Sequence, residues 1–444
     1  MSPATGGLII RASRLVDGTG APAVRDPSVV VENGRIGKIY AGPAPEGGWP
    51  PGARTLDLRG HTLLPGLIDA HVHLVLPGDG TPFETSVREP DGVLTVAAGE
   101  NARRALRAGI TTVRDCGGMR DTTLDLQRAR QLGYAILPRL HLCGRPITIT
   151  GGHCWYFGGE VDGIDEIRRM VRRLLKSGVD YIKIMATGGG TVGTMSWLPS
   201  FSAEELRAAV DEAHRFGRRV GIHSLCAEAT RHVLAAGADQ IEHAYFIVDA
   251  DGRQEFEPRV ADAIAQAGTP VTTTLSVGHY LIEALSRREG RAAEDQDLLE
   301  RWRGMFARTL ENARRMHAAG VRFAAGTDAG WRFTPFDGLV TEIELIREAG
   351  ASPAEAIAAA TSDAATAMGI GAQTGSLREG LAADIIAVVG DPLADLGVLR
   401  RPAMVMLGGI VVVPENSSGC PATLDRVSGD SYGVKYEAGH QGPK

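Results

Sequence analysis

The 444-residue sequence lacks a cysteine pattern, an excess of basic charge and any long apolar run. Its five cysteines are odd in number, widely spaced and without a Cys-X-X-Cys pair, which argues against a disulfide framework and against a thiolate zinc site. They are Cys116, Cys143, Cys154, Cys226 and Cys420. A reducing compartment is the simpler interpretation of this cysteine usage.

The charge balance leaves no strongly basic surface. The chain has 47 basic and 53 acidic residues and a formal net charge of −6, so neither nucleic acid nor an anionic membrane is an expected partner. With 43% hydrophobic and 23% charged residues, the composition is that of an ordinary globular protein. We therefore expect a small-molecule substrate.

No targeting or membrane segment is recognisable. The N-terminal sequence has no basic region followed by a long apolar core, and no later apolar run approaches the roughly 18 residues of a membrane span. The sequence predicts a soluble, cytoplasmic protein, and we also expect a homo-oligomer.

Two kinds of strand pattern divide the chain. The first sixty residues read as short alternating strands between Gly, Pro and Asn-Gly turns, at 7–10, 29–32, 36–40 and 53–58. From residue 63 on, short apolar strands alternate with longer amphipathic helices, and eight such units in about 300 residues fit an α/β fold of the (β/α)8 TIM-barrel type. The eight strands are expected at 63–74, 111–115, 140–144, 181–186, 220–225, 241–246, 271–275 and 323–327.

A strand pattern returns after the last predicted barrel helix, 352–368, with strands at 384–389 and 403–413. These strands are expected to join the N-terminal ones, because neither end is long enough to bury a core alone. The predicted domains are a small composite β-sandwich of residues 1–62 plus 372–415, a TIM barrel of residues 63–371, and a polar C-terminal tail of residues 416–444.

Several histidines fall at the ends of predicted barrel strands. His71 and His73 end the first strand, and residues two apart in an extended chain project to the same side. His223 ends the fifth strand, His243 the sixth and Asp328 the eighth, so all five residues meet at the C-terminal rim of the barrel. Because imidazole and carboxylate are the ligands of zinc, manganese and cobalt, the pattern predicts a divalent-metal site.

Two further residues join this rim. Lys183 lies in the apolar fourth strand, where a charged amine is costly unless it is paired or deprotonated; a surface lysine is the alternative, although barrel strands have no edge. His153 follows the third strand beside Gly151 and Gly152, within reach of a substrate carbonyl or its oxyanion. Its alternative is a loop imidazole bonded to backbone.

These motifs resemble the amidohydrolase superfamily in its binuclear form. The resemblance is carried by Leu-Pro-Gly-Leu-Ile-Asp before His71-Val72-His73, by Lys183, His223 and His243, and by Gly-Thr-Asp at 326–328. The stretches 150–153, 183–189 and 241–243 resemble the branch that contains prolidase-like dipeptidases, metal-dependent carboxypeptidases, imidazolonepropionase and hydrolases of carbamate or urea compounds.

The resemblance implies a ligand set. His71, His73 and Asp328 would bind one metal ion, His223 and His243 a second, and Lys183, carboxylated by carbon dioxide, would bridge them. A carbamate supplies two anionic oxygens and removes the buried cation. Zinc is the expected metal, with manganese or cobalt as alternatives, and Asp328 and His153 are the expected catalytic residues.

The implied reaction is hydrolysis of an amide-type C–N bond by metal-activated hydroxide, in a dipeptide, N-acyl amino acid, carbamate or urea. One alternative is a mononuclear-zinc cyclic amide hydrolase or deaminase resembling imidazolonepropionase, against which Lys183 argues. Another is a non-enzymatic assembly protein, but that class loses its ligands and here every ligand position is filled.

The substrate is not determined by the sequence. Arg332 or Arg120 could hold a substrate carboxylate, and the aromatic stretch 154–157 favours an apolar or aromatic substrate part. The roles of four further rim residues stay open: Tyr245, His279, Trp331 and Arg332.

Overall fold

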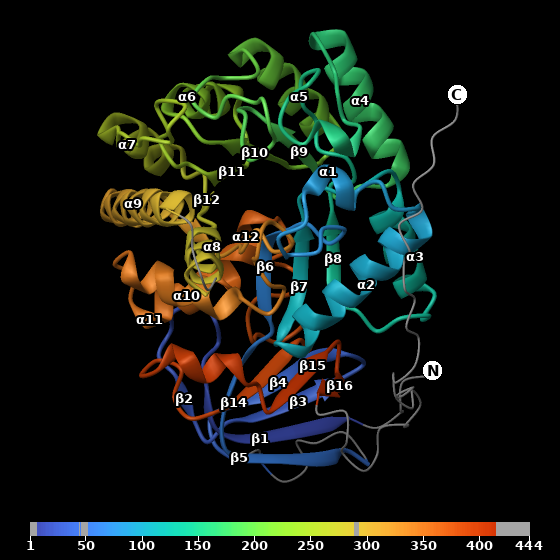
Figure 1. Ribbon diagram of the computed structural model, residues 1–444. Coiled ribbons are helices and arrows are strands. Elements are labelled where there is room, and N and C mark those ends of the chain that lie inside the picture. The colour runs from blue at the N-terminus through green and yellow to red at the C-terminus, as the bar shows by residue number, and fades with distance from the viewer. Residues whose placement is uncertain (1–6, 44, 46–51, 288–292, 414–444) are drawn as a thin grey trace, which may run out of the picture.

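The computed structural model describes residues 7–43, 45, 52–287 and 293–413. The tail predicted at 416–444, with Cys420, lies outside the described residues. Figure 1 shows a β-sheet layer formed by both ends of the described chain, and above it a larger part in which strands alternate with helices. The expected α/β class is confirmed.

Strands from both ends of the chain pair in one mixed sheet. Its order is β16-β15-β14-β5-β1-β3-β4, with β2 paired to β1. The long strand β5 (Arg54–Pro65) pairs in parallel with β1 (Leu8–Leu15) and antiparallel with β14 (Ile385–Val389), so it joins the two ends of the chain. The other strands are β2 (Val24–Arg25), β3 (Ser28–Glu32), β4 (Arg35–Tyr40), β15 (Met404–Leu407) and β16 (Ile410–Val413).

Eight parallel strands form the second part, in two sheets of order β6-β7-β8 and β13-β12-β11-β10-β9. Backbone hydrogen bonds link the two sheets along both edges, from Ala70 to Ala325 at 2.9 Å and from Ile147 to Lys183 at 2.8 Å. The strands are β6 (Leu67–Val72), β7 (Ile110–Asp115), β8 (Arg139–Leu142), β9 (Ile182–Met185), β10 (Val220–Ser224), β11 (Gln240–His243), β12 (Val271–Thr272) and β13 (Phe323–Ala324).

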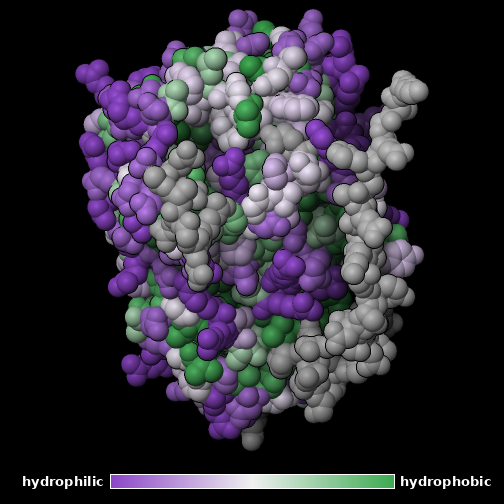
Figure 2. Space-filling model, in the orientation of Figure 1, coloured by the Kyte–Doolittle hydropathy of each residue, from purple (hydrophilic) through white to green (hydrophobic). Residues whose placement is uncertain are grey.

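Helices follow the parallel strands and cover their outer side (Figure 1). On the face shown in Figure 2, hydrophilic side chains dominate over these helices, since their apolar sides pack inward. Helix α5 begins with the capping box predicted from Ser202 and Glu205. Among the described residues, no helix combines the length and apolarity that crossing a membrane requires.

The helices have the following bounds. Before β10 they are α1 (Phe83–Ser86), α2 (Asp91–Arg107), α3 (Thr122–Gln131), η1 (Trp155–Phe157), α4 (Ile164–Ser177) and α5 (Ala203–Arg215). After β10 they are α6 (Ala227–Ala236), α7 (Pro258–Ala267), α8 (Ser276–Ser286), α9 (Ala293–Ala318), α10 (Leu339–Glu348), α11 (Pro353–Ala359), α12 (Ser362–Ala367) and η2 (Leu396–Arg400).

The predicted strand 63–74 is in fact two strands of different sheets. The chain leaves β5 at Pro65 and enters β6 at Leu67, because the Gly66 amide donates to Asp384 instead of continuing the ladder. A side chain at Gly66 would overlap Thr111, with the Cβ only 2.1 Å from its Oγ1. Strand β5 therefore runs across the domain boundary expected between residues 62 and 63.

Several parallel strands end earlier than predicted. Backbone φ angles turn positive at His243 (75°), Thr274 (48°) and Asp328 (59°), which is incompatible with further strand pairing. Positive φ is unusual for residues other than glycine, and such strained positions concentrate at functional sites. Here they end β11 and follow β12 and β13.

Candidate metal centre

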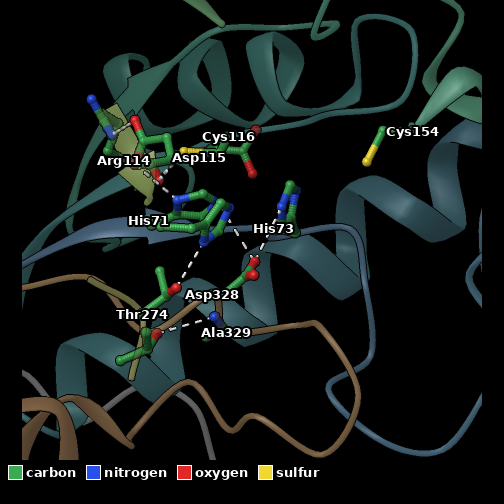
Figure 3. A network of polar contacts seen from close by, with 12 residues as sticks. His71, His73, Arg114, Asp115, Cys116, Cys154, Thr274, Asp328 and Ala329 are labelled. Carbon is green, nitrogen blue, oxygen red and sulfur yellow. Dashed lines mark hydrogen bonds and ion pairs between the residues drawn. The ribbon is translucent and has the colours of Figure 1, made fainter. Parts of the chain in front are cut away.

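The six predicted ligands lie at one end of the parallel strands. His71 is on β6 and His73 follows it, Lys183 is on β9, His223 on β10, His243 ends β11, and Asp328 follows β13. All six are buried. Figure 3 shows His71, His73 and Asp328 pointing toward one another.

Asp328 is the meeting point of the first group. Its Oδ1 lies 3.5 Å from Nε2 of His71 and 3.3 Å from Nε2 of His73. His71, His243 and Asp328 each offer a donor atom within 4.8 Å of the others, a spacing at which one metal ion could be held. The grouping therefore includes His243, which the sequence resemblance assigned to a second metal.

The remaining imidazoles continue this cluster. The ring centroids of His223 and His243 are 4.6 Å apart, and those of His153 and His223 are 4.7 Å apart. Nδ1 of His243 lies 2.8 Å from the Thr274 hydroxyl, which leaves Nε2 available as a ligand. His153 thus lies beside the predicted ligands, as expected for a residue that acts on substrate.

Lys183 is fully buried and has no counter-ion in close contact. Its Nζ lies 4.0 Å from Oε1 of Glu242 and forms no hydrogen bond among the described residues. Nδ1 of His73 and Oδ1 of Asp328 are likewise buried without a hydrogen-bond partner among the described residues. Buried polar atoms without partners are costly, so the donor set fits divalent metal ions and a carboxylated lysine.

Burial sets the charge state of the imidazoles. It lowers the pKa of His153 to about 3 and holds the pKa values of His223 and His243 well below the usual range. Burial alone would raise the pKa of Asp328, but the neighbouring His71 and His73 outweigh it and lower that pKa. Neutral imidazoles and an ionised carboxylate are the forms that bind metal.

The loop after β9 supports His153. Nδ1 of His153 lies 2.8 Å from the Thr191 hydroxyl, so the imidazole is bonded to a side chain and not to backbone. A Cβ at Gly189 would lie 2.6 Å from Nε2 of His153, so this position leaves room for the ring only because it is glycine. The sequence singled out this glycine-rich stretch but did not connect it to His153.

Sequence reasoning missed two residues of the site, Glu242 and Arg114. Oε2 of the fully buried Glu242 lies 3.0 Å from Nδ1 of His71, and the guanidinium of Arg114 donates to Oε1. The available signal was a charged residue in an apolar strand directly before His243. Cys116 is close to the same pair, since His71, Cys116 and Glu242 offer donor atoms within 4.8 Å of one another.

The two arginines considered as carboxylate anchors differ in their surroundings. Arg120 forms an ion pair with Asp91, whereas the Arg332 guanidinium lies over the rings of Trp331 and Phe83, at 5.3 and 5.8 Å from their centroids. No ion pair of Arg332 occurs among the described residues.

The other rim residues contact neighbouring loops. The Tyr245 hydroxyl lies 2.6 Å from Oγ1 of Thr274, and His279 packs edge-on against Tyr280. These contacts leave the roles of Tyr245 and His279 toward a substrate open.

Comparison with known sequences points in one direction. The profile of the Amidohydrolase family matches residues 62–412. The ochratoxinase of Aspergillus niger is 30% identical over a 438-residue alignment that covers 89% of this chain and 84% of that protein. An imidazolonepropionase of Rhizorhabdus wittichii is 28% identical, with 83% of this chain and 89% of that protein covered.

Solved structures agree with the sequence comparison. A Xaa-Pro dipeptidase crystallised with methionine in its active site is 28% identical and superimposes with a TM-score of 0.79, covering 91% of this chain and 99% of that one. A prolidase-like protein from Bifidobacterium longum is 30% identical, with a TM-score of 0.75 and coverage of 93% and 95%.

Proposed function

The chain belongs to the amidohydrolase family and is a C–N bond hydrolase, and we propose that it cleaves an amide-type bond of a small molecule with two divalent metal ions. The observation that carries this proposal is the convergence of six buried donor residues at the C-terminal ends of parallel strands. We further propose that the parallel strands form a closed (β/α)8 barrel of residues 63–371, with residues 1–62 and 372–415 as a composite β-sandwich.

In this proposal His71, His73 and Asp328 bind one ion and His223 and His243 bind the other. Lys183, carboxylated on Nζ, bridges the two ions, with zinc the expected metal and manganese or cobalt the alternatives. The buried Nζ without a hydrogen bond among the described residues supports this role, since a carbamate removes the unpaired cation.

When bound, ions of this kind lower the pKa of water and polarise a substrate carbonyl. Asp328 is ionised, and its Oδ1 forms no hydrogen bond among the described residues, so it can accept a proton from the attacking water and return it to the leaving nitrogen. His153, neutral and held by Thr191, orients the substrate carbonyl.

The nucleophile in this proposal is water and not a cysteine. Cys154 lies beside His153, with its Sγ 3.5 Å from Nε2, but burial raises the pKa of its thiol to about 12. A thiol with that pKa is protonated near neutral pH and is a poor nucleophile.

The proposed substrates are dipeptides, N-acyl amino acids, carbamates and ureas. Amide-bond hydrolysis fits the relatives named as ochratoxinase and Xaa-Pro dipeptidase. The alternative is a mononuclear-zinc cyclic amide hydrolase or deaminase, favoured by similarity to imidazolonepropionase. The buried Lys183 disfavours it, because a single-metal site needs no bridge.

A substrate panel tests this function. We expect protein loaded with zinc, manganese or cobalt to hydrolyse at least one of the four open-chain substrate classes, to lose that activity after chelation and to regain it when metal is restored. Release of amine is the measurement. Hydrolysis confined to cyclic amides would favour the mononuclear alternative, and no C–N hydrolysis by metal-loaded protein would contradict the proposal.

A further inference from the structure

Glu242 lies between the predicted ligands and the interior of the strands. Its side chain is fully buried, with Oε2 3.0 Å from Nδ1 of His71 and Oε1 bonded to Arg114. The same Oε1 lies 4.0 Å from Nζ of Lys183. One carboxylate thus contacts one predicted ligand and approaches another, although no metal role was predicted for it.

Arg114 is itself fixed from several directions. Its Nε donates to the Ala70 carbonyl at 2.7 Å, and Nη1 donates to Oε1 of Gln240 at 2.5 Å. The guanidinium also lies over the Tyr181 ring, 5.0 Å from its centroid. Because an arginine has only donors, it holds Glu242 in an orientation that presents an acceptor to Arg114.

The backbone around this pair leaves no spare room. A Cβ at Gly221, on the neighbouring strand β10, would lie 2.8 Å from Oε1 of Glu242. The carboxylate therefore has one position between Arg114 and His71. A fixed acceptor of this kind determines which nitrogen of a facing imidazole carries hydrogen.

We propose that Glu242 is a positioning residue that holds His71 as the tautomer with hydrogen on Nδ1, leaving Nε2 free to bind metal, and that Arg114 fixes the oxygen that does this. The inference rests on the proposed metal centre. A carboxylate only accepts hydrogen bonds, so the Nδ1 atom that faces it must donate. Nε2 is then turned toward Asp328, at 3.5 Å from Oδ1.

The variant Glu242→Gln tests the role of the carboxylate. Arg114 still requires an acceptor, so it takes the amide oxygen and turns the amide NH2 toward Nδ1 of His71. Nδ1 must then accept, which moves the hydrogen to Nε2 and blocks the ligand position. We expect metal affinity to fall by about 10- to 100-fold, measured by competition with a chromogenic chelator for zinc, manganese or cobalt.

The double variant Glu242→Gln with Arg114→Met separates positioning from packing. Without the guanidinium the amide can turn its oxygen toward Nδ1, so the double variant should bind metal more tightly than Glu242→Gln alone. A merely structural network would instead lose further affinity when the second residue is removed. A double variant that binds more weakly than the single one would overturn the inference.

Asp384→Asn is the matched control if the double variant does not fold. Asp384 is a buried carboxylate paired with Arg139 at 3.2 Å in the terminal sheet, away from the predicted ligands. It should retain wild-type metal affinity, whereas equal losses in Asp384→Asn and Glu242→Gln would overturn the inference. A wild-type chain that binds no metal would contradict the proposed function as well, while equal binding by wild type and Glu242→Gln would contradict only this inference.

Discussion

Replacing Lys183 with alanine is expected to remove metal binding and to reduce turnover by roughly 10³-fold or more, while the chain still folds. Metal ions contribute several kcal/mol to transition-state charge stabilisation, and each 1.36 kcal/mol is about a factor of ten in rate. The side chain is fully buried and its Nζ forms no hydrogen bond among the described residues, so no structural contact of that amine is lost. Elemental analysis, kcat/KM and the melting temperature are the measurements.

Rescue and a matched control sharpen this prediction. Added short carboxylic acids, such as acetate or propionate, should partly restore metal binding and turnover in Lys183→Ala, because they supply the missing pair of oxygens. Lys176→Ala removes an exposed lysine from the last turn of α4 and should behave as wild type. A fully active Lys183→Ala protein would contradict the bridging role.

Replacing Asp328 with asparagine is expected to leave at least one metal ion bound and to lower kcat by about 10³-fold or more. The amide cannot accept the proton from water or return it to the leaving nitrogen, so the base and the acid are lost together. The imidazole ligands remain, and KM should change little. The measurement is kcat and KM of the metal-loaded variant on whichever substrate the panel identifies.

The outcome separates two roles of Asp328. An Asp328→Asn protein that has lost all metal would show that the carboxylate acts mainly as a ligand. Turnover like that of wild type, with metal bound, would refute the proposed proton transfer. Asp384→Asn, the buried carboxylate in the terminal sheet, serves again as the control for burial alone.

The convergence of the ligands could be predicted because it follows from strand direction. Apolar runs located the strands, and parallel strands place their C-terminal ends at one edge, so His223 and His243 could be brought together without knowing any distance. The pairing of the chain ends followed from the shortness of each segment. The metal assignments themselves stay predictions.

The supporting contacts could not be predicted in this way. Arg114 and Glu242 are 128 residues apart on β7 and β11, which are not neighbours in a sheet, so no local pattern reports their ion pair. The positive φ at Thr274, which accompanies the early end of β12, depends on the packing of the rim. Likewise, Gly189 reads as one residue of a glycine-rich loop until the His153 ring is placed beside it.

The split between β5 and β6 also depended on tertiary contacts. An apolar run through 63–74 resembles one continuous strand, and only the hydrogen bond from Gly66 to Asp384 redirects the chain between two sheets. Periodicity identifies the extended conformation but not the partner of each backbone amide.

Metal stoichiometry tests the central claim most directly. Protein purified without chelator, then analysed for zinc, manganese and cobalt by elemental analysis, is expected to contain close to two ions per chain. About one ion per chain, persisting after metal is added in excess, would contradict the lysine-bridged pair and support a mononuclear site at the same histidines.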